Sequence, residues 1–354
     1  MGSSSDSAGH QRLPLSELQA WERLGYGMFI HFGMSTFDGE ECSPGTAPPS
    51  AFHPEHLDVR NWVRLAREAG MRYAILTAKH ISGFCLWPSR WTDYHVGNSP
   101  VPVDIVGEFV AACDAEGIVP GLFYTSWDNH HSFGSRNHNE LGWGLGYVTP
   151  RYEEFQTRQI TELVKRHPNL GELWIDIPSM LDRGYKDELY AHVAALAPHC
   201  KILLNRGLNI GLSVDAREAW PTDVFAVERI TPNGFGWNPW QTVEGKKYYI
   251  PCETCETIGM EWFFTEGDSA RSVEELLGLF YLTRCRNSNA LFNVGPDRSG
   301  RVPGWQRNAL LELRDRILED MRRRSPDDDP HLDEVADFIP KLSLRGSKSA
   351  GVTD

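Results

Sequence analysis

The segment Glu172-Leu173-Trp174-Ile175-Asp176 has the pattern of a buried strand that ends directly on a carboxylate. Seven further short apolar segments are spaced along the chain, and nearly all lead into a side chain that binds polar groups or exchanges protons. In a (β/α)8 barrel the functional residues stand at the carboxyl ends of the strands. The pattern therefore predicts an α/β fold, a (β/α)8 TIM-like barrel. The other candidate strands are residues 25–30 before His31, 73–78 before Lys79 and His80, 119–123 before Tyr124, 201–204 before Asn205 and Arg206, 224–227 before Glu228, 262–264, and 290–292 before Asn293.

Amphipathic helices are expected between these strands. Asp104 is a suitable N-cap, apolar residues recur on one helical face as far as Cys113, and Gly117 is a suitable stop. Similar stripes occur over residues 152–164, 273–286 and 305–321. Two long loops, residues 36–54 and 126–150, follow the first and third strands, where a barrel builds its pocket.

Three segments are expected along the chain. Residues 1–14 are expected to be a disordered N-terminal segment or a remnant of an expression vector, and residues 15–324 to form the barrel domain. Residues 325–354 have the low-complexity composition of a polar tail. Residues 1–7 lack the basic and apolar regions of a signal peptide. The compartment stays open: cytoplasmic, or secreted or periplasmic if a signal peptide was removed.

Composition narrows the classes of partner. The chain has 354 residues, of which 41% are hydrophobic and 23% charged, as in a globular protein with one large barrel. No stretch approaches the roughly 18 apolar residues of a membrane span. The net charge of −13 argues against nucleic acid, whose binders cluster Lys and Arg. Seven cysteines, an odd number spread along the chain, do not form the pattern of a disulfide scaffold. The oligomeric state stays open, with a homo-oligomer among the alternatives.

Several motifs occur in order between Trp21 and Ile317. They are residues 27–33 (GMFIHFG), 76–80 (LTAKH), 83–89 (GFCLWPS), 92–94 (TDY), 104–106 (DIV), 172–176 (ELWID) and 291–297 (LFNVGPD). This set resembles the α-L-fucosidases of glycoside hydrolase family 29. The resemblance implies a retaining exo-glycosidase that removes terminal α-L-fucose through a covalent intermediate, without cofactor or metal, from a fucosylated oligosaccharide or glycoconjugate. Many members carry a β-sandwich after the barrel, and we expect a single catalytic domain without one here.

Retaining glycosidases need two carboxyl groups about 5–5.5 Å apart, one as nucleophile and one as acid/base. The resemblance makes Asp176 the nucleophile. Two residues are candidates for the acid/base. Glu228 resembles the glutamate that closes the strand after an Asn/Arg-containing one, and Glu253, in Cys252-Glu253-Thr254-Cys255, matches a Trp-Glu-x-Cys segment of the family. We favour Glu228 and keep Glu253 as the alternative.

The resemblance also implies a set of sugar-binding residues. His31, His80 and Tyr124 stand where members of the family place residues that bind hydroxyl groups. Arg206 matches an arginine near the nucleophile, and Glu41 matches the glutamate of a Glu-Trp pair that binds sugar hydroxyls. A sugar site requires such polar groups at the rim of an aromatic pocket.

Two positions depart from the family pattern. The tryptophan of the Glu-Trp pair is replaced by Cys42, and the usual Lys-His-His-Asp-Gly-Phe is replaced by a segment with Ile81 and Ser82 after His80. Trp127 and its neighbours Asp128, His130 and His131 are the candidates to replace the missing contacts. We expect weak activity on a simple aryl fucoside and better activity on a particular fucosylated oligosaccharide, because each lost neutral hydrogen bond costs roughly 0.5–1.5 kcal/mol.

Alternatives of other classes remain. A metal-dependent hydrolase would use His31, His80 and carboxylates as ligands, but it would need a His-x-His pair or a bridging lysine on defined strands, and neither appears. Cys252-x-x-Cys255 lacks a second ligand pair at metal spacing, so it does not predict a zinc site. A barrel hydrolase acting on a related deoxy or L-galactosyl sugar is another alternative. A catalytically weak fucose-binding protein is the third, and its support is the altered segment at Ile81.

Overall fold

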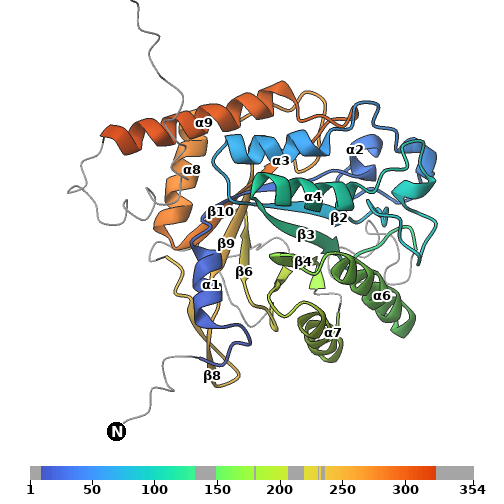
Figure 1. Ribbon diagram of the computed structural model, residues 1–354, viewed down its shortest axis with the longest axis horizontal. Helices are drawn as coiled ribbons and strands as arrows, with labels where there is room; N and C mark the ends of the chain where they lie inside the picture. The colour runs from blue at the N-terminus through green and yellow to red at the C-terminus, as the bar shows by residue number, and fades with distance from the viewer. Residues whose placement is uncertain are drawn as a thin grey trace, which may run out of the picture.

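Eight parallel strands form one sheet, in the order β5-β4-β3-β2-β1-β10-β9-β6, with helices packed around it (Figure 1). The computed structural model describes residues 9–131, 149–178, 181–205, 219–229, 231–232 and 236–323. The predicted TIM-like barrel is confirmed. The strands are β1 Tyr26–Ile30, β2 Tyr73–Lys79, β3 Val119–Thr125, β4 Glu172–Asp176, β5 Lys201–Asn205, β6 Phe225–Glu228, β9 Cys252–Thr257 and β10 Ser288–Val294.

The barrel is nearly closed between its two edge strands. The segment before β6 replaces a regular ladder there: the Asp223 amide donates to the Ile202 carbonyl over 2.8 Å, and the Leu204 amide donates to Thr222 Oγ1 over 3.2 Å. These bonds satisfy backbone groups of β5 that an open sheet edge would leave unpaired. The carboxyl ends of all eight strands therefore meet at one end of the barrel.

One predicted strand is wrong. Residues 262–264 form a loop, and the strand at this place in the barrel is β9, which comes earlier in the chain. β9 was not predicted because Glu253, Thr254 and Thr257 interrupt its apolar pattern. All three are buried and have hydrogen-bond partners inside the protein. The run at 262–264 is apolar for another reason, since Trp262 and Phe263 pack on the aromatic interior of the barrel.

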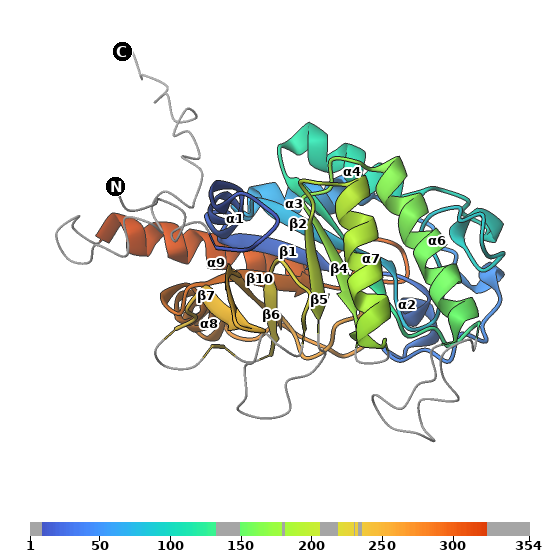
Figure 2. The same cartoon turned by 90° about the horizontal axis from the view of Figure 1, so that it is seen from below.

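Helices cover the outside of the sheet, with α6 and α7 side by side on one flank (Figure 2). The predicted start and end of α4 are confirmed: the Asp104 side chain accepts from the Gly107 amide, and Gly117 ends the helix with φ +69°. The helices are α1 Leu15–Glu22, α2 Met34–Asp38, α3 Val59–Glu68, α4 Ile105–Glu116, α6 Pro150–Arg166, α7 Arg183–Leu196, α8 Val273–Cys285 and α9 Gly304–Arg323, with short 3₁₀ helices at Pro49–Ala51 and Val96–Asn98. The hairpin β7 Trp240–Val243 and β8 Lys246–Tyr249 joins β6 to β9.

The sheet is buried on both faces, as in most parallel sheets. Its inner face is filled by aromatic side chains such as Phe29, Phe123 and Trp174, and its outer face packs against the helices. At the amino ends of the strands α1 closes the barrel, where Trp21 Nε1 donates to Glu172 Oε2 over 2.8 Å. In the described part of the chain, the interior of the barrel therefore opens at the carboxyl ends of the strands.

Residues 9–14 do not fit the expected disordered N-terminus. Leu13 is buried, and the Arg12 guanidinium donates to the Pro198 carbonyl and forms an ion pair with Asp223. The Arg12 side chain serves as the counterion that the buried Asp223 carboxylate needs. Residues 1–8 and the predicted tail, 325–354, lie outside the described residues.

Candidate active site

A pocket opens at the carboxyl ends of the strands. Side chains from β1, β3, β4, β5, β6 and β9 and from three loops contribute to its wall. The lining residues are Phe29, His31, Glu41, His80, Phe123, Trp174, Asp176, Asn205, Glu228, Cys255 and Trp262. Five of the nine predicted site residues, namely His31, Glu41, His80, Asp176 and Glu228, thus meet in one place.

Asp176 is the last residue of β4, and its carboxylate is held by neighbouring donors. Asn205 Nδ2 donates to Asp176 Oδ1 over 2.8 Å, and the Ile177 amide also donates to this carboxylate. Ile177 has φ +51°, a strained conformation for a β-branched residue. Burial raises the pKa of Asp176 to about 7, although both donors lower it. The strand end therefore presents a fixed, partly desolvated carboxyl group.

Glu228 is the last residue of β6, and β5 lies between β6 and β4 in the nearly closed barrel. Burial raises its pKa to about 8, and the neighbouring charge of Asp176 adds to the effect. Asn205 donates to Asp176 and also lowers the pKa of Glu228, and its own Oδ1 is buried without a partner among the described residues. As pH rises, Asp176 is therefore the first of the pair to ionise, while Glu228 keeps its proton longer.

The hydrogen bonds of His31 fix its tautomer. Asn293 Nδ2 donates to the Trp262 carbonyl over 2.7 Å, so Asn293 Oδ1 is the atom that faces His31 Nδ1, at 2.6 Å. Oδ1 can only accept, and Nδ1 must therefore carry the proton. Burial lowers the pKa of His31 well below its usual value, which keeps the ring neutral. Its Nε2 is left as an acceptor for a ligand hydroxyl.

His80 and Glu41 complete the polar part of the wall. The His80 ring stacks on Phe123 with 5.5 Å between centroids, and burial lowers its pKa to about 3. His80 Nδ1 is buried and has no hydrogen-bond partner among the described residues. Burial also raises the pKa of Glu41, although the Arg229 guanidinium opposes this. The pocket thus offers neutral hydrogen-bonding groups beside the two carboxyl groups.

Two predicted binding residues point elsewhere. Tyr124 donates from its hydroxyl to Gln159 Oε1 on α6 over 2.8 Å, on the helix side of β3. Side chains alternate along a strand, so Phe123 faces the pocket and Tyr124 cannot. Trp127 is fully buried outside the pocket, where it packs with Ile81 and Ile177. Arg206 lies outside the described residues, and its role stays a prediction.

Glu253 lies deep in the barrel, beneath the pocket. It is the second residue of β9, where it accepts from the Tyr73 hydroxyl over 2.5 Å and from Trp174 Nε1 over 3.0 Å. Burial, together with the nearby Glu172, raises the pKa of Glu253 well above its usual value. Its place in the fold suits support of the Trp174 ring, which lines the pocket, better than contact with a ligand.

The two departures from the family pattern lie together. Ile81 belongs to a buried apolar cluster with Trp127 and Ile177, and Cys42 packs against that cluster. Neither Ile81 nor Cys42 is among the residues that line the pocket. The substitutions thus form one packed unit behind the loop that follows Asp176, in place of two separate contacts to a ligand.

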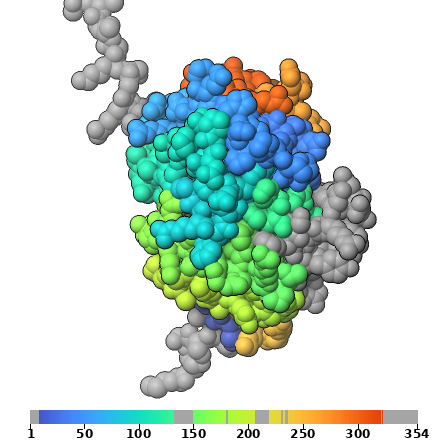
Figure 3. Space-filling view, turned by 90° about the vertical axis from the view of Figure 1, so that its right-hand side faces the viewer, coloured from blue at the N-terminus to red at the C-terminus, as the bar shows by residue number. Residues whose placement is uncertain are grey.

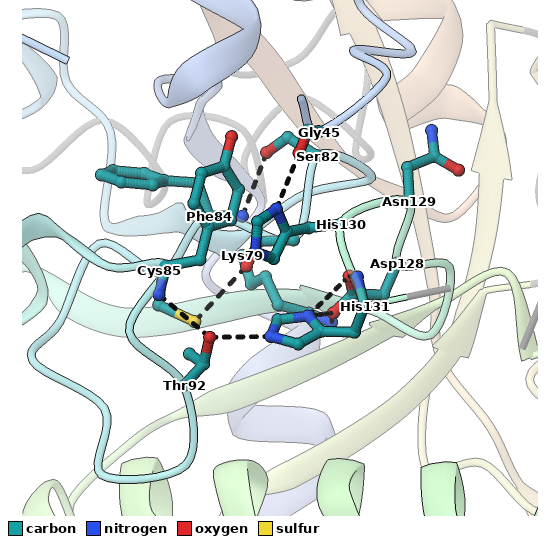
Figure 4. A network of polar contacts seen from close by, with 12 residues as sticks. Gly45, Lys79, Ser82, Phe84, Cys85, Thr92, Asp128, Asn129, His130 and His131 are labelled. Atoms are coloured by element: carbon teal, nitrogen blue, oxygen red, sulfur yellow. Dashed lines mark hydrogen bonds and ion pairs between the residues drawn. The ribbon is translucent and has the colours of Figure 1, made fainter. Parts of the chain in front are cut away.

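The loop residues expected to replace these contacts belong to another network (Figure 4). Asp128 forms a fully buried ion pair with Lys79, at 2.8 Å between Oδ2 and Nζ. His131 joins Asp128 to Thr92, and the His130 ring stacks on Tyr94 at 3.8 Å. Although burial raises the pKa of Asp128, Lys79 and His131 hold it below its usual value. These residues fasten the loops after β2 and β3 together.

We expect Asp128→Asn to reduce the free energy of unfolding by about 3–5 kcal/mol, because it leaves the Lys79 ammonium buried without its counterion. Urea denaturation followed by tryptophan fluorescence measures the change. The matched control is Asp187→Asn, which breaks an exposed pair with Arg183 and should cost less than about 1 kcal/mol. Equal losses for the two variants would show that the buried pair does not stabilise these loops.

Three residues in or beside the pocket were not predicted as site residues. Asn205 was recognised only as a strand end, yet it donates to Asp176 and lowers the pKa of both carboxyl groups. Arg229 follows Glu228 with φ +55°, and its guanidinium lies over the Trp262 ring at 5.1 Å. Trp262 itself was assigned to a strand. The sequence could have indicated Asn205 and Arg229 by their positions, since each stands at or next to the end of a strand.

Two carboxyl groups at strand ends of a TIM barrel, in a pocket with neutral polar groups and aromatic rings, are the arrangement of barrel glycoside hydrolases. Among the described residues, no group of three His, Cys, Asp or Glu side chains is placed to hold a metal ion. The sequence model of the α-L-fucosidase family matches residues 46–315. The chain belongs to this family, glycoside hydrolase family 29.

Individual relatives agree with the family. The chain is 32% identical to α-L-fucosidase 1 of Arabidopsis thaliana, over 96% of this chain and 65% of that protein. It is 31% identical to putative α-L-fucosidase 1 of Oryza sativa subsp. japonica, over 83% and 56%. The solved α-L-fucosidase isoenzyme 1 from Paenibacillus thiaminolyticus has 26% identity and a TM-score of 0.72, over 86% and 76%. The chain thus spans under two thirds of the length of the two plant relatives. Among its described helices, none is long and apolar enough to cross a membrane.

Proposed function

We propose that this protein hydrolyses terminal α-L-fucosyl linkages of oligosaccharides or glycoconjugates and retains the anomeric configuration. The observation that carries the proposal is the pair Asp176 and Glu228 in one pocket, joined by Asn205, with pKa values of about 7 and about 8. Because the pKa of Asp176 is the lower of the two, Asp176 suits the role of an ionised nucleophile while Glu228 is still protonated as the acid. Membership of the α-L-fucosidase family supports the choice of sugar.

In the first step the Asp176 carboxylate attacks the anomeric carbon. The bond to the leaving oxygen breaks as Glu228 donates its proton to that oxygen. In the second step Glu228 takes a proton from water, the water oxygen attacks the same carbon, and the bond to Asp176 breaks. Both carboxyl groups return to their starting states. The desolvation that raises both pKa values also strengthens their interaction with the charge that develops on the sugar.

The rest of the wall suits a deoxy sugar. His31 Nε2, His80 Nδ1 and Asn205 Oδ1 are polar atoms without a protein partner among the described residues, and each can bond a sugar hydroxyl. Burying such atoms unpaired is costly, so a ligand that supplies hydroxyl groups is favoured. Phe29 and Trp262 provide apolar surface for a ring face or a methyl group.

A panel of nitrophenyl glycosides tests this proposal. Hydrolysis of the α-L-fucoside should exceed that of the α-L-galactoside and the β-D-fucoside, and NMR should show α-L-fucose as the first product. Preference for the α-L-galactoside would assign the site to a related sugar. Binding of fucose with no hydrolysis of aryl or oligosaccharide fucosides would identify a binding protein. A β anomer as the first product would exclude the retaining mechanism.

The pKa values predict a bell-shaped dependence of kcat/KM on pH. Activity should fall below the pKa of Asp176, about 7, because the protonated carboxyl cannot attack. It should fall again above the pKa of Glu228, about 8, because the acid has lost its proton. The optimum should therefore lie between these values. Initial rates on the aryl fucoside at low substrate concentration measure the profile, and a rate constant that stays flat from about pH 5 to about pH 10 would contradict the assignment.

A further inference from the structure

A second hollow lies on the outer surface, between α6 and the segment that follows β2. Figure 3 shows this side of the molecule. The hollow has a volume of about 680 Å³, well within the range of small-molecule sites. Its lining residues are Pro88, Arg90, Trp91, Arg158, Thr161, Glu162, Lys165 and Arg166. None of them belongs to the wall of the barrel pocket. We call this hollow the α6 groove.

The charged residues that line the α6 groove are mostly cationic, although the chain as a whole is acidic. Four of its lining residues are cationic and one is acidic, on a chain whose net charge is −13. The acidic residue, Glu162, is already engaged: its Oε2 accepts from Trp87 Nε1 over 2.8 Å, and its Oε1 accepts from the Arg90 amide over 3.2 Å. Arg158 and Arg166 form ion pairs with Glu154 and Asp104, whereas Arg90 and Lys165 form no side-chain ion pair among the described residues. The groove therefore carries positive charge that is open to an anionic ligand.

An exposed tryptophan lies in the same groove. Trp91 is 41% exposed, and it is one of the few large apolar side chains exposed in the described part of the chain. The Arg158 guanidinium lies over its ring at 4.5 Å, which fixes the indole and places a cation beside it. An exposed, oriented indole is a surface on which a sugar ring can stack, because it offers a flat apolar face at low entropic cost.

The groove continues toward the catalytic end of the barrel. A neighbouring hollow of about 270 Å³ shares Trp91 and Arg158 with it and is also lined by His131, Arg151, Glu154 and Phe155. Phe155 lies in the first turns of α6, and His131 follows β3, so this second hollow lies at the carboxyl ends of the strands. Because the two hollows share Trp91 and Arg158, they adjoin each other along α6.

We propose that the α6 groove is a binding site for an anionic oligosaccharide, with Trp91 stacking on a sugar ring and Arg90 and Lys165 binding its carboxylate or sulfate groups. Both kinds of group are recognised by charge-assisted hydrogen bonds from arginine and lysine. Neither the stacking nor the charge contacts involve the barrel pocket, so this site does not depend on the proposed hydrolysis.

Isothermal titration calorimetry of the full chain tests the site with three hexasaccharides: a galacturonate oligomer, a sulfated heparin-type oligomer and neutral maltohexaose. Binding of either anionic oligomer, with no binding of the neutral one, supports the proposal and identifies the anionic group. The double variant Arg90→Glu/Lys165→Glu should weaken that binding at least about tenfold. Trp91→Ala should weaken it about fivefold through loss of the stacking surface.

The matched control is Lys246→Glu/Lys247→Glu, which makes the same charge change on the exposed hairpin, where Lys247 also lies over a tryptophan. It should change affinity by less than about twofold, because the exposed charges are screened over this distance. Equal weakening by the control, an unaltered affinity in Trp91→Ala, or equally tight binding of single-stranded DNA would overturn the proposal. So would failure of both anionic oligomers to bind at millimolar concentration.

Discussion

Asp176→Ala should lower kcat on an aryl α-L-fucoside by roughly 10⁴-fold or more, because no other group can form the glycosyl-enzyme. Asp176 is suited to this role by its position: it ends β4, Asn205 orients its carboxylate, and the strained Ile177 directs a backbone amide toward it. A nucleophile must be held within a fraction of an ångström of the productive geometry. Asp176→Asn should lower kcat to a similar extent, since the neutral amide cannot attack the anomeric carbon.

Azide adds a diagnostic to this experiment. In Asp176→Ala, azide can enter the space left by the carboxylate and attack the anomeric carbon from the same face, so turnover should recover and the product should be the inverted fucosyl azide. Asp187→Ala, at an exposed site on α7, is the matched control and should retain normal activity. The assignment fails if Asp176→Ala keeps more than about a tenth of the normal kcat with unchanged stability.

Glu228→Ala should have the second largest effect, and its size should depend on the leaving group. Loss of a general acid costs roughly 10²–10⁴-fold when the leaving oxygen needs a proton and much less when it does not. A dinitrophenyl fucoside should therefore be cleaved far better than a fucosylated disaccharide. With azide, this variant should release a fucosyl azide of retained configuration, because Asp176 still forms the intermediate.

Glu253→Gln separates the two acid candidates. The amide keeps an acceptor for the Tyr73 hydroxyl, and the site needs no charge because burial already favours the neutral acid. We therefore expect similar losses on the activated and unactivated substrates, together with reduced stability. A selective loss on the disaccharide in Glu253→Gln, absent from Glu228→Ala, would reverse the two roles.

The sequence predicted the barrel and the strand-end residues because both follow from a local pattern. Asp176 and Glu228 each end an apolar run, and strand ends of a barrel converge whatever the loops do. Tyr124 was predicted to follow the third strand, but β3 continues to Thr125. Because side chains alternate between the two faces of a strand, Tyr124 points toward α6. A one-residue error of this kind reverses the face of a side chain.

Long-range pairing could not be predicted. β9 was missed because its polar residues are satisfied by partners distant in the chain, such as Tyr73 and Trp174 for Glu253. Likewise, His130 and His131 lie near the site in sequence, but Tyr94 and Asp128 draw them into a separate network. Ile81 and Cys42 were interpreted as two lost contacts, whereas the fold packs them into one apolar cluster.

Trapping of the covalent intermediate tests the central claim most directly. A 2-deoxy-2-fluoro-L-fucosyl fluoride slows both steps, and its good leaving group lets the intermediate accumulate. Mass spectrometry of the intact protein should show the added mass of one fluorofucosyl group, and peptide mapping should place it on Asp176. A label on Glu228 or Glu253, or hydrolysis with inversion and no label, would contradict the account.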